Sequence, residues 1–167
     1  MRITFLYLPL FSFLFLFSSE GKVFAQNKKE IKSNKIKSAT ESVTETASGK
    51  EVTYKDTYSS FDKNGNVLEE IKYNPDGTIK RKTTTKYDSF KNKTEEIEYD
   101  GAGAVTKKQQ YSYNSKGDKT LEVEYDSSNK LVKKTVYIYD SKGLRVEKKV
   151  YNGDNVLQKS HKFVYDM

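Results

Sequence analysis

A short motif, an aromatic residue followed by aspartate or asparagine, recurs along the last two thirds of the chain. Its nine copies begin at Phe61, Tyr73, Tyr87, Tyr99, Tyr113, Tyr125, Tyr139, Tyr151 and Tyr165. The spacing between successive copies alternates between 12 and 14 positions, so the true repeat has a period of 26. A fixed period of this length is typical of repeat proteins, in which each unit packs on the next. The motif therefore predicts an array of similar units.

Each motif copy is followed by a turn signal. Glycine or asparagine, which tolerate a positive φ, stands four positions after seven of the first eight aromatic residues. In the stretch NPDG that starts at Asn74, the residues suit a type I turn followed by a left-handed glycine. This order predicts a three-residue hairpin loop that ends in a glycine bulge. At the exception, Lys91, the neighbouring Asn92 predicts a turn shifted by one residue.

The segments between the turns alternate in polarity and are rich in Val, Ile, Thr and Tyr, which is typical of β-strands. We predict an all-β fold, a single antiparallel meander of about eight to nine strands that forms a twisted, open sheet. Pairing of Asn74 with Thr78 would place each aromatic residue opposite the residue six positions later. The earliest strand is expected over residues 51–60, after a turn at residues 48–50.

The even spacing also makes a prediction about the two faces of the sheet. Because 12 and 14 are both even, residues of one parity are expected to stay on one face. Odd positions carry most of the tyrosine, isoleucine and leucine, so one face is expected to be apolar, with Ile71 opposite Arg81. The same register puts Lys93, Lys119 and Arg145 opposite the tyrosines of one rim, where cation–π contacts are expected.

Residues 1–25 have the order of a secretory signal peptide, with Arg2, an apolar run and Ala25 before Gln26. The run over residues 3–17 is shorter than the about 20 residues that a membrane-spanning helix needs. We expect cleavage after Ala25, no transmembrane segment afterwards, and a periplasmic, cell-surface or extracellular protein. Residues 26–47 are rich in Lys, Ser, Thr and Glu, which predicts a flexible polar linker that is partly helical around residues 28–37, and residues 48–167 form the repeat domain.

The composition excludes several kinds of site. With no cysteine, the chain offers no disulfide, thiolate nucleophile or cysteine-ligated metal. His161 is the only histidine, and the loop that begins at Asp62 lacks the closing glutamate of a calcium-binding loop. The net charge of +7 is spread over charged residues of both signs, which argues against a nucleic-acid partner. We predict no enzyme activity, no catalytic residue, no metal and no cofactor.

The signature Tyr-Asp/Asn-x-x-Gly, with good copies at Tyr73 and Tyr139, resembles the tyrosine–aspartate (YD or RHS-type) β-hairpin repeats of large exported bacterial proteins. The resemblance covers residues 48–167. It implies a spiralling antiparallel sheet that binds carbohydrate or contributes to a toxin-enclosing shell, and it carries over no catalytic residue. The alternating spacing of 12 and 14 positions departs from the family pattern.

One rim of the predicted sheet collects aromatic side chains that could stack on sugar rings or on an extended polymer. Alternate strands would place these side chains about 9–10 Å apart. The same rings could instead form the core of the sheet itself. The candidate ligand-binding residues are Tyr87, Tyr111, Tyr113, Tyr137, Tyr139, Phe163 and Tyr165.

These observations lead to one expected function and two alternatives. We expect a secreted or envelope-associated, non-enzymatic repeat module that presents a binding or structural surface. The first alternative is a carbohydrate-binding module that uses the aromatic rim. The second is self-assembly or adhesion through sheet edges near residues 52–58 and 156–165. The candidate partners are a polysaccharide, another envelope protein and a second copy of the chain.

Overall fold

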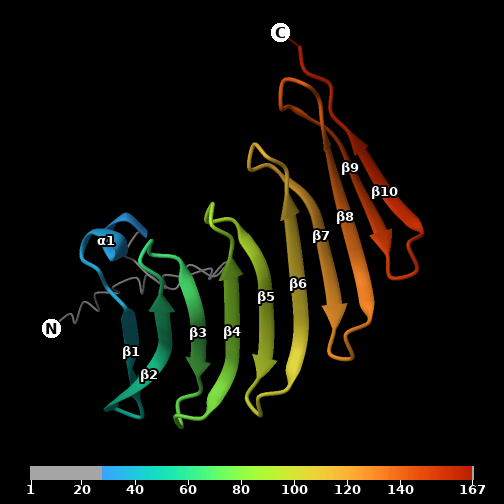
Figure 1. Cartoon of the computed structure of the whole chain (residues 1–167). Coiled ribbons are helices and arrows are strands. Elements are labelled where there is room, and N and C mark those ends of the chain that lie inside the picture. Colours follow the sequence, from blue (N-terminus) through green and yellow to red (C-terminus); the bar gives the residue numbers. More distant parts are fainter. Residues whose placement is uncertain (1–27, 167) are drawn as a thin grey trace, which may run out of the picture.

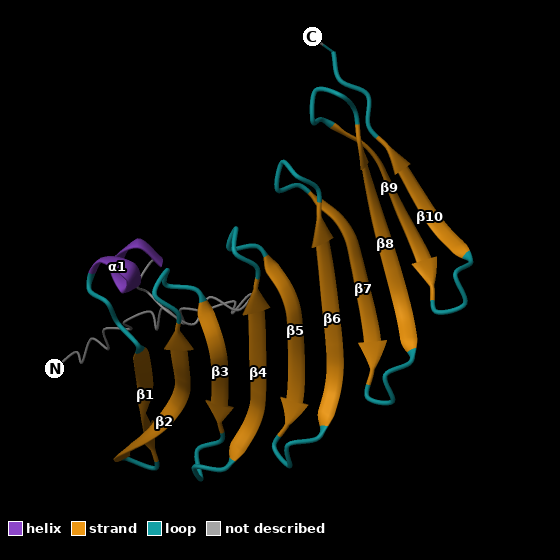
Figure 2. Ribbon diagram, in the orientation of Figure 1, coloured by secondary structure: helices purple, strands orange, loops and turns teal. Residues whose placement is uncertain are grey.

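Ten antiparallel strands form one open sheet in the computed structural model, which describes residues 28–166 (Figures 1 and 2). The strands lie side by side in sequence order, and a short helix, α1 (Lys28–Ser33), lies beside β1 and β2. The strands are β1 (Ser38–Ala47), β2 (Lys50–Phe61), β3 (Val67–Tyr73), β4 (Ile79–Tyr87), β5 (Lys93–Asp100), β6 (Val105–Tyr113), β7 (Lys119–Asp126), β8 (Leu131–Tyr139), β9 (Arg145–Asn152) and β10 (Leu157–Lys162). The predicted open all-β meander is confirmed, with one strand more than expected.

The eight hairpins between β2 and β10 share one turn, as the repeat predicts. In the β3–β4 turn the Asn74 amide donates to the Thr78 carbonyl, and the Gly77 amide to the Asn74 carbonyl, both at 2.9 Å. Gly77 has a φ of +83°, the left-handed conformation that glycine adopts without strain. Lys91 holds the same position of the β4–β5 turn with a φ of 72°, so the predicted shift toward Asn92 is wrong.

Replacing Lys91 by glycine is expected to stabilise the protein by about 0.5–1 kcal/mol. The substitution removes the strain of a lysine with positive φ, and part of this gain is offset by the larger entropy of glycine in the unfolded chain. Asn129→Gly, at the same turn position with a φ of 58°, should gain less, since asparagine tolerates this conformation. Urea unfolding measures both. A Lys91→Gly variant no more stable than the wild type would contradict the strain assigned to Lys91.

The predicted register is correct for the residue pair next to each turn and wrong for the pairs beyond it. At every one of these hairpins the aromatic residue lies opposite the residue six positions later, as Tyr73 does with Ile79. Ile71, however, pairs with Lys82 and not with Arg81. The bulge beside each turn sets two residues of one strand against one of the other, so the register shifts by one.

This shift exchanges the faces at every hairpin. Because side chains alternate along a strand, odd positions of β3 share a face with even positions of β4 and with odd positions of β5. The odd-numbered apolar residues are therefore divided between the two faces, and the predicted one-sided apolar sheet is wrong. The even-numbered apolar residues of β2 follow the same rule, since Tyr58 pairs with Ile71.

The apolar core of this single layer is small. Among the described residues, Ile31 and Phe61 are the buried apolar side chains, with 5% and 7% of their surface exposed. The sheet is stabilised mainly by its backbone hydrogen bonds and by cross-strand side-chain pairs. On one face, a lysine ammonium lies close to a tyrosine ring once in every unit. The distances to the ring centre are 5.8 Å for Lys82–Tyr99, 5.8 Å for Lys108–Tyr125 and 4.8 Å for Lys134–Tyr151.

Over residues 26–47, the predicted partial helix is confirmed at residues 28–33, and the predicted flexible linker is wrong at residues 38–47. Residues 28–33 form α1, in which Ile31 is buried, and residues 38–47 form β1. A two-residue turn at Ser48 and Gly49, both with positive φ, joins β1 to β2. The side chains of β1 are mostly polar, but its backbone is paired with β2 along its length and its threonines favour strands. The sheet therefore begins ahead of the predicted boundary at residue 48.

The predicted signal peptide, with its cleavage point after Ala25, lies outside the described residues. The same is true of the first two residues of the predicted linker. Within residues 28–166, no helix has the length and apolar character needed to cross a membrane.

Candidate binding surface

The seven predicted ligand-binding residues form two columns that cross the strands near one end of the sheet. The first column, which we call the clasp tyrosines, consists of Tyr87, Tyr113, Tyr139 and Tyr165. The second column supplies the rings of what we call the cation–aromatic ladder, and it consists of Tyr111, Tyr137 and Phe163. We call the face of the sheet that carries these rings the ladder face.

Each clasp tyrosine joins its own strand to the strand before it. The contact lies at the end of this strand pair that is away from the connecting hairpin. Tyr87 on β4 donates its hydroxyl hydrogen to the carbonyl of Val67, at the start of β3, at 3.1 Å. The same bond recurs once in every unit, as Tyr113 to Lys93 (2.8 Å), Tyr139 to Lys119 (2.9 Å) and Tyr165 to Arg145 (2.8 Å). Burial, followed by the charges of Asp62 and Glu96, raises the pKa of Tyr87 to about 12, so this hydroxyl stays a donor at neutral pH.

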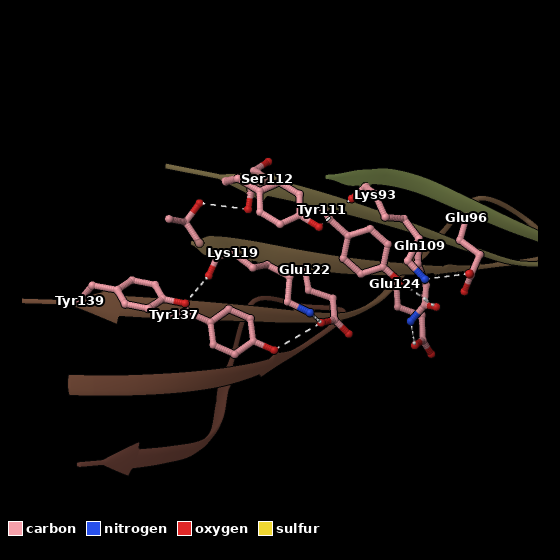
Figure 3. Close-up of polar contacts among 12 residues, drawn as sticks. Lys93, Glu96, Gln109, Tyr111, Ser112, Lys119, Glu122, Glu124, Tyr137 and Tyr139 are labelled. Carbon is pink, nitrogen blue, oxygen red and sulfur yellow. Dashed lines mark hydrogen bonds and ion pairs between the residues drawn. The ribbon is translucent and has the colours of Figure 1, made fainter. Parts of the chain in front are cut away.

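Cations and rings alternate along the ladder, as Figure 3 shows for Tyr111, Lys119 and Tyr137. The distances from the charged group to the ring centre are 5.3 Å for Lys93–Tyr111, 5.1 Å for Lys119–Tyr111, 5.3 Å for Lys119–Tyr137, 5.6 Å for Arg145–Tyr137 and 5.2 Å for Arg145–Phe163. The predicted cation–π contacts therefore involve rings two residues before the rim tyrosines. The rim hydroxyls are directed to backbone carbonyls instead.

Acidic side chains complete the ladder. Glu122 accepts hydrogen bonds from the Lys119 ammonium at 2.7 Å and from the Tyr137 hydroxyl at 3.3 Å. Partial burial alone would raise the pKa of Glu122, but these partners hold it below its ordinary value. Burial would lower the pKa of Lys119, but Glu122 raises it. Burial and the charge of Glu96 raise the pKa of Tyr111.

Glu122→Gln is expected to reduce stability at neutral pH, and this deficit should shrink as the pH falls through the folded-state pKa of Glu122. The folded-state pKa of Glu122 lies below its unfolded value of about 4.3, so the stabilisation is present above that pH and is lost as the pH falls through the folded pKa. Urea unfolding of both proteins at neutral and acidic pH measures the difference. Glu51→Gln, which alters an exposed carboxylate on β2, is the control. A deficit that persists undiminished in acid would contradict this account.

The ladder contacts favour a structural role for its rings. Tyr111 and Tyr137 each meet a cation from both neighbouring strands. A flat ligand would have to displace these cations before it could stack on either ring. Ligand binding by the seven residues as a set stays a prediction.

A groove opens at the rim, between the β4–β5 turn and the β6–β7 turn. Its volume is about 730 Å³, and Tyr111, Tyr113 and Phe90 line it. The side chain of Phe90 is 83% exposed. Asn92 and Asn114 add amide groups to the lining. Of the seven predicted residues, the groove thus brings together two, and it adds an aromatic ring that was not predicted.

The repeat explains why the groove is open at this place. One unit later, Lys116 occupies the turn position of Phe90, and its ammonium donates to the Ser141 carbonyl of the next turn at 3.3 Å. Phenylalanine has no donor with which to bridge two turns in this way. Phe90 was not among the residues predicted from the sequence. A comparison of residues 26 positions apart would have found it, because no other turn of the repeat contains an aromatic residue at this place.

The other side chains considered from the sequence have structural surroundings. The Asp62 carboxylate accepts hydrogen bonds from the backbone amides of Asn64 at 2.7 Å and Asn66 at 2.9 Å, so it stabilises its turn. His161 lies on β10 opposite Lys148. Over residues 28–166, no group of three or more His, Asp or Glu side chains is placed to hold a metal ion.

Comparisons with known proteins assign no family to the chain. No protein-family model and no curated protein matches it. Among solved structures, TarM is similar with a TM-score of 0.31 and 17% identity over 74% of this chain, which spans only 21% of TarM. A porin-like protein from Bacteroides uniformis ATCC 8492 gives a TM-score of 0.31 and 9% identity, covering 75% of this chain and 82% of that one. A protein of unknown function (BF3112) from Bacteroides fragilis NCTC 9343 gives 0.23 and 20%, covering 78% and 96%.

Proposed function

We propose that the chain is an exported, non-enzymatic repeat module whose sheet rim presents a binding surface. The groove beside Phe90 carries the proposal, because it lies where the repeat replaces a bridging lysine with an exposed ring. An apolar ring left in water lowers its free energy when a partner covers it. The signal-peptide pattern of residues 1–25 and the resemblance to YD-type repeats support export.

A carbohydrate is the ligand that the chemistry of this groove favours. Phe90 offers a flat apolar face to the C–H side of a sugar ring. Ser115, and the amide hydrogens that Asn92 and Asn114 do not use within their own turns, can bond to hydroxyl groups around it. The volume of about 730 Å³ falls within the range of about 300–1,000 Å³ that is usual for small-ligand sites.

Binding of fluorescent glycans and envelope polysaccharide fractions to wild-type and Phe90→Lys proteins tests the proposal. The lysine restores the residue of the repeat and can bridge to the Ser115 carbonyl, as Lys116 does to Ser141, which closes the groove. Asn64→Lys adds the same charge at the same turn position one unit earlier and is the control. We expect Phe90→Lys alone to lose binding. Equal binding by all three proteins, or by none, would contradict the proposal.

A second candidate function is self-association through the sheet edges. The predicted edge at residues 52–58 is wrong, because β2 pairs with both β1 and β3. β1 and β10 are the two edge strands, and their charges are opposite, with Glu41 and Glu45 on β1 and Lys159 and Lys162 on β10. Because ten strands alternate in direction, β10 of one copy and β1 of the next can pair antiparallel and continue the meander. Sedimentation at rising concentration tests this. We expect assembly that the double substitution K159E/K162E weakens, and a strictly monomeric protein would rule it out.

A further inference from the structure

The cation–aromatic ladder ends one ring short on β4. Its rings occupy one position on every second strand, with Tyr111 on β6, Tyr137 on β8 and Phe163 just after β10. One unit before Tyr111, the same position on β4 holds Thr85. The repeat therefore continues through this strand, but the ring is missing.

A hollow of about 310 Å³ lies on the ladder face where this ring is missing. Thr83 and Thr85 of β4 line it, together with Glu70 from β3 and with Lys93 and Glu96 from β5. Two of these neighbours correspond to a residue of the ladder. Glu96 and Glu70 are the equivalents of Glu122 one and two units earlier. The hollow thus has the carboxylates of a ladder ring and one of its two cations, because Val67 of β3 stands where the second cation would be.

Lys93 contacts one aromatic ring, whereas the equivalent lysine of the next unit contacts two. Lys119, one unit later, lies 5.1 Å from the ring centre of Tyr111 and 5.3 Å from that of Tyr137. Lys93 lies 5.3 Å from Tyr111 and also borders the hollow. A ring at the position of Thr85 would meet Lys93 as Tyr111 meets Lys119. Such a contact is worth about a two- to fivefold gain in affinity when it is partly exposed.

Glu70 supplies the acceptor that a phenol hydroxyl needs. The Tyr137 hydroxyl donates to Glu122, which stands 15 positions earlier, and Glu70 has the same spacing from Thr85. Glu70 has an ion pair with Arg81 at 4.0 Å, a distance too long for a hydrogen bond. A carboxylate oxygen of Glu70 can therefore accept a hydrogen bond from a guest in the hollow.

We propose that this hollow binds a phenol ring, stacked against Lys93 with its hydroxyl donating to Glu70. A tyrosine side chain of a partner polypeptide and a free phenol share this chemistry. The site lies on the face of β3, β4 and β5, whereas the groove beside Phe90 lies at the rim. The proposal is therefore independent of the proposed function, and either can fail without the other.

Titration of the isotope-labelled protein with p-cresol, followed by amide chemical shifts, tests the site. We expect saturable shifts centred on Thr83, Thr85 and Lys93. Thr85→Tyr fills the hollow and should abolish them, whereas Thr85→Val keeps the hollow and should retain them. Lys93→Met should weaken binding about two- to fivefold. The absence of saturable shifts in the wild type, or unchanged shifts in Thr85→Tyr, would overturn the proposal.

A gain of binding gives a second test that does not depend on how Thr85→Tyr folds. Tyr111→Thr should open an equivalent hollow between Lys93 and Lys119, and p-cresol should then shift amides around residue 111 as well. A folded Tyr111→Thr protein without this second set of shifts would count against the proposal. Comparison of p-cresol with N-acetyltyrosinamide separates the two sources: tighter binding of the amide indicates a polypeptide partner, and tighter binding of p-cresol indicates a free phenol.

Discussion

Replacing Phe61 by alanine is expected to lower the free energy of unfolding by about 3–5 kcal/mol, the cost of truncating a buried phenylalanine. Phe61 is 7% exposed at the end of β2, and it lines two hollows together with Ile31 of α1. The segment between α1 and β1 is also bonded to the end of β2, because the Phe61 amide donates to the Lys37 carbonyl at 2.9 Å. In a sheet with so few buried apolar side chains, little else can compensate for the loss.

Urea unfolding measures this cost, with Phe90→Ala as the matched control. Phe90 is the same residue type but is 83% exposed, so its truncation should change stability by no more than about 0.5 kcal/mol. If both substitutions had equally small effects, the contact between α1 and β2 would contribute little to the fold. If both had equally large effects, Phe90 would be buried in solution and the groove at the rim would be closed.

Gly65→Ala is expected to destabilise the protein through two separate costs. Gly65 has a φ of +76°, which costs an alanine about 1–2 kcal/mol. An added Cβ would also lie 2.7 Å from the Lys28 carbonyl oxygen and 3.3 Å from the Lys32 amide nitrogen, so α1 must move away. This crowding adds about 1–3 kcal/mol.

Gly117→Ala separates the two contributions, because Gly117 occupies the same turn position with a φ of +86° and no atom within 4 Å of its added Cβ. It should incur the backbone strain alone. Amide hydrogen exchange at Asn34 and Ile36, whose amides donate to Glu30 and Ile31, reports on the helix. We expect faster exchange there in Gly65→Ala and unchanged exchange in Gly117→Ala. Equal effects of the two substitutions would mean that α1 does not pack on this turn.

The turns and the rim pairs could be predicted from the sequence because their signals are local. Asn74 and Gly77 specify one hairpin loop by their own conformational preferences, and the loop then places Tyr73 opposite Ile79. The face of each strand could not be obtained in this way. It depends on where the extra residue of the bulge sits, and counting the residues between turns does not reveal this.

Three further features were not predicted from the sequence. β1 has the polar composition of a linker, although its threonines favour strands, and it is stabilised by pairing with β2. The open groove at Phe90 and the hollow at Thr85 are departures from the repeat. Each becomes visible only when a residue is compared with its equivalents 26 positions away, such as Lys116 and Tyr111.

The bulged register determines which side chains share a face, and it places Lys93, Lys119 and the ladder rings together. Pairs of introduced cysteines test it directly, since the chain has none of its own. Val123 lies opposite Lys134, at a separation that a disulfide can span, whereas Lys133 projects from the other face. Oxidation should join cysteines at 123 and 134 and leave cysteines at 123 and 133 free. A disulfide between 123 and 133, with none between 123 and 134, would contradict the account.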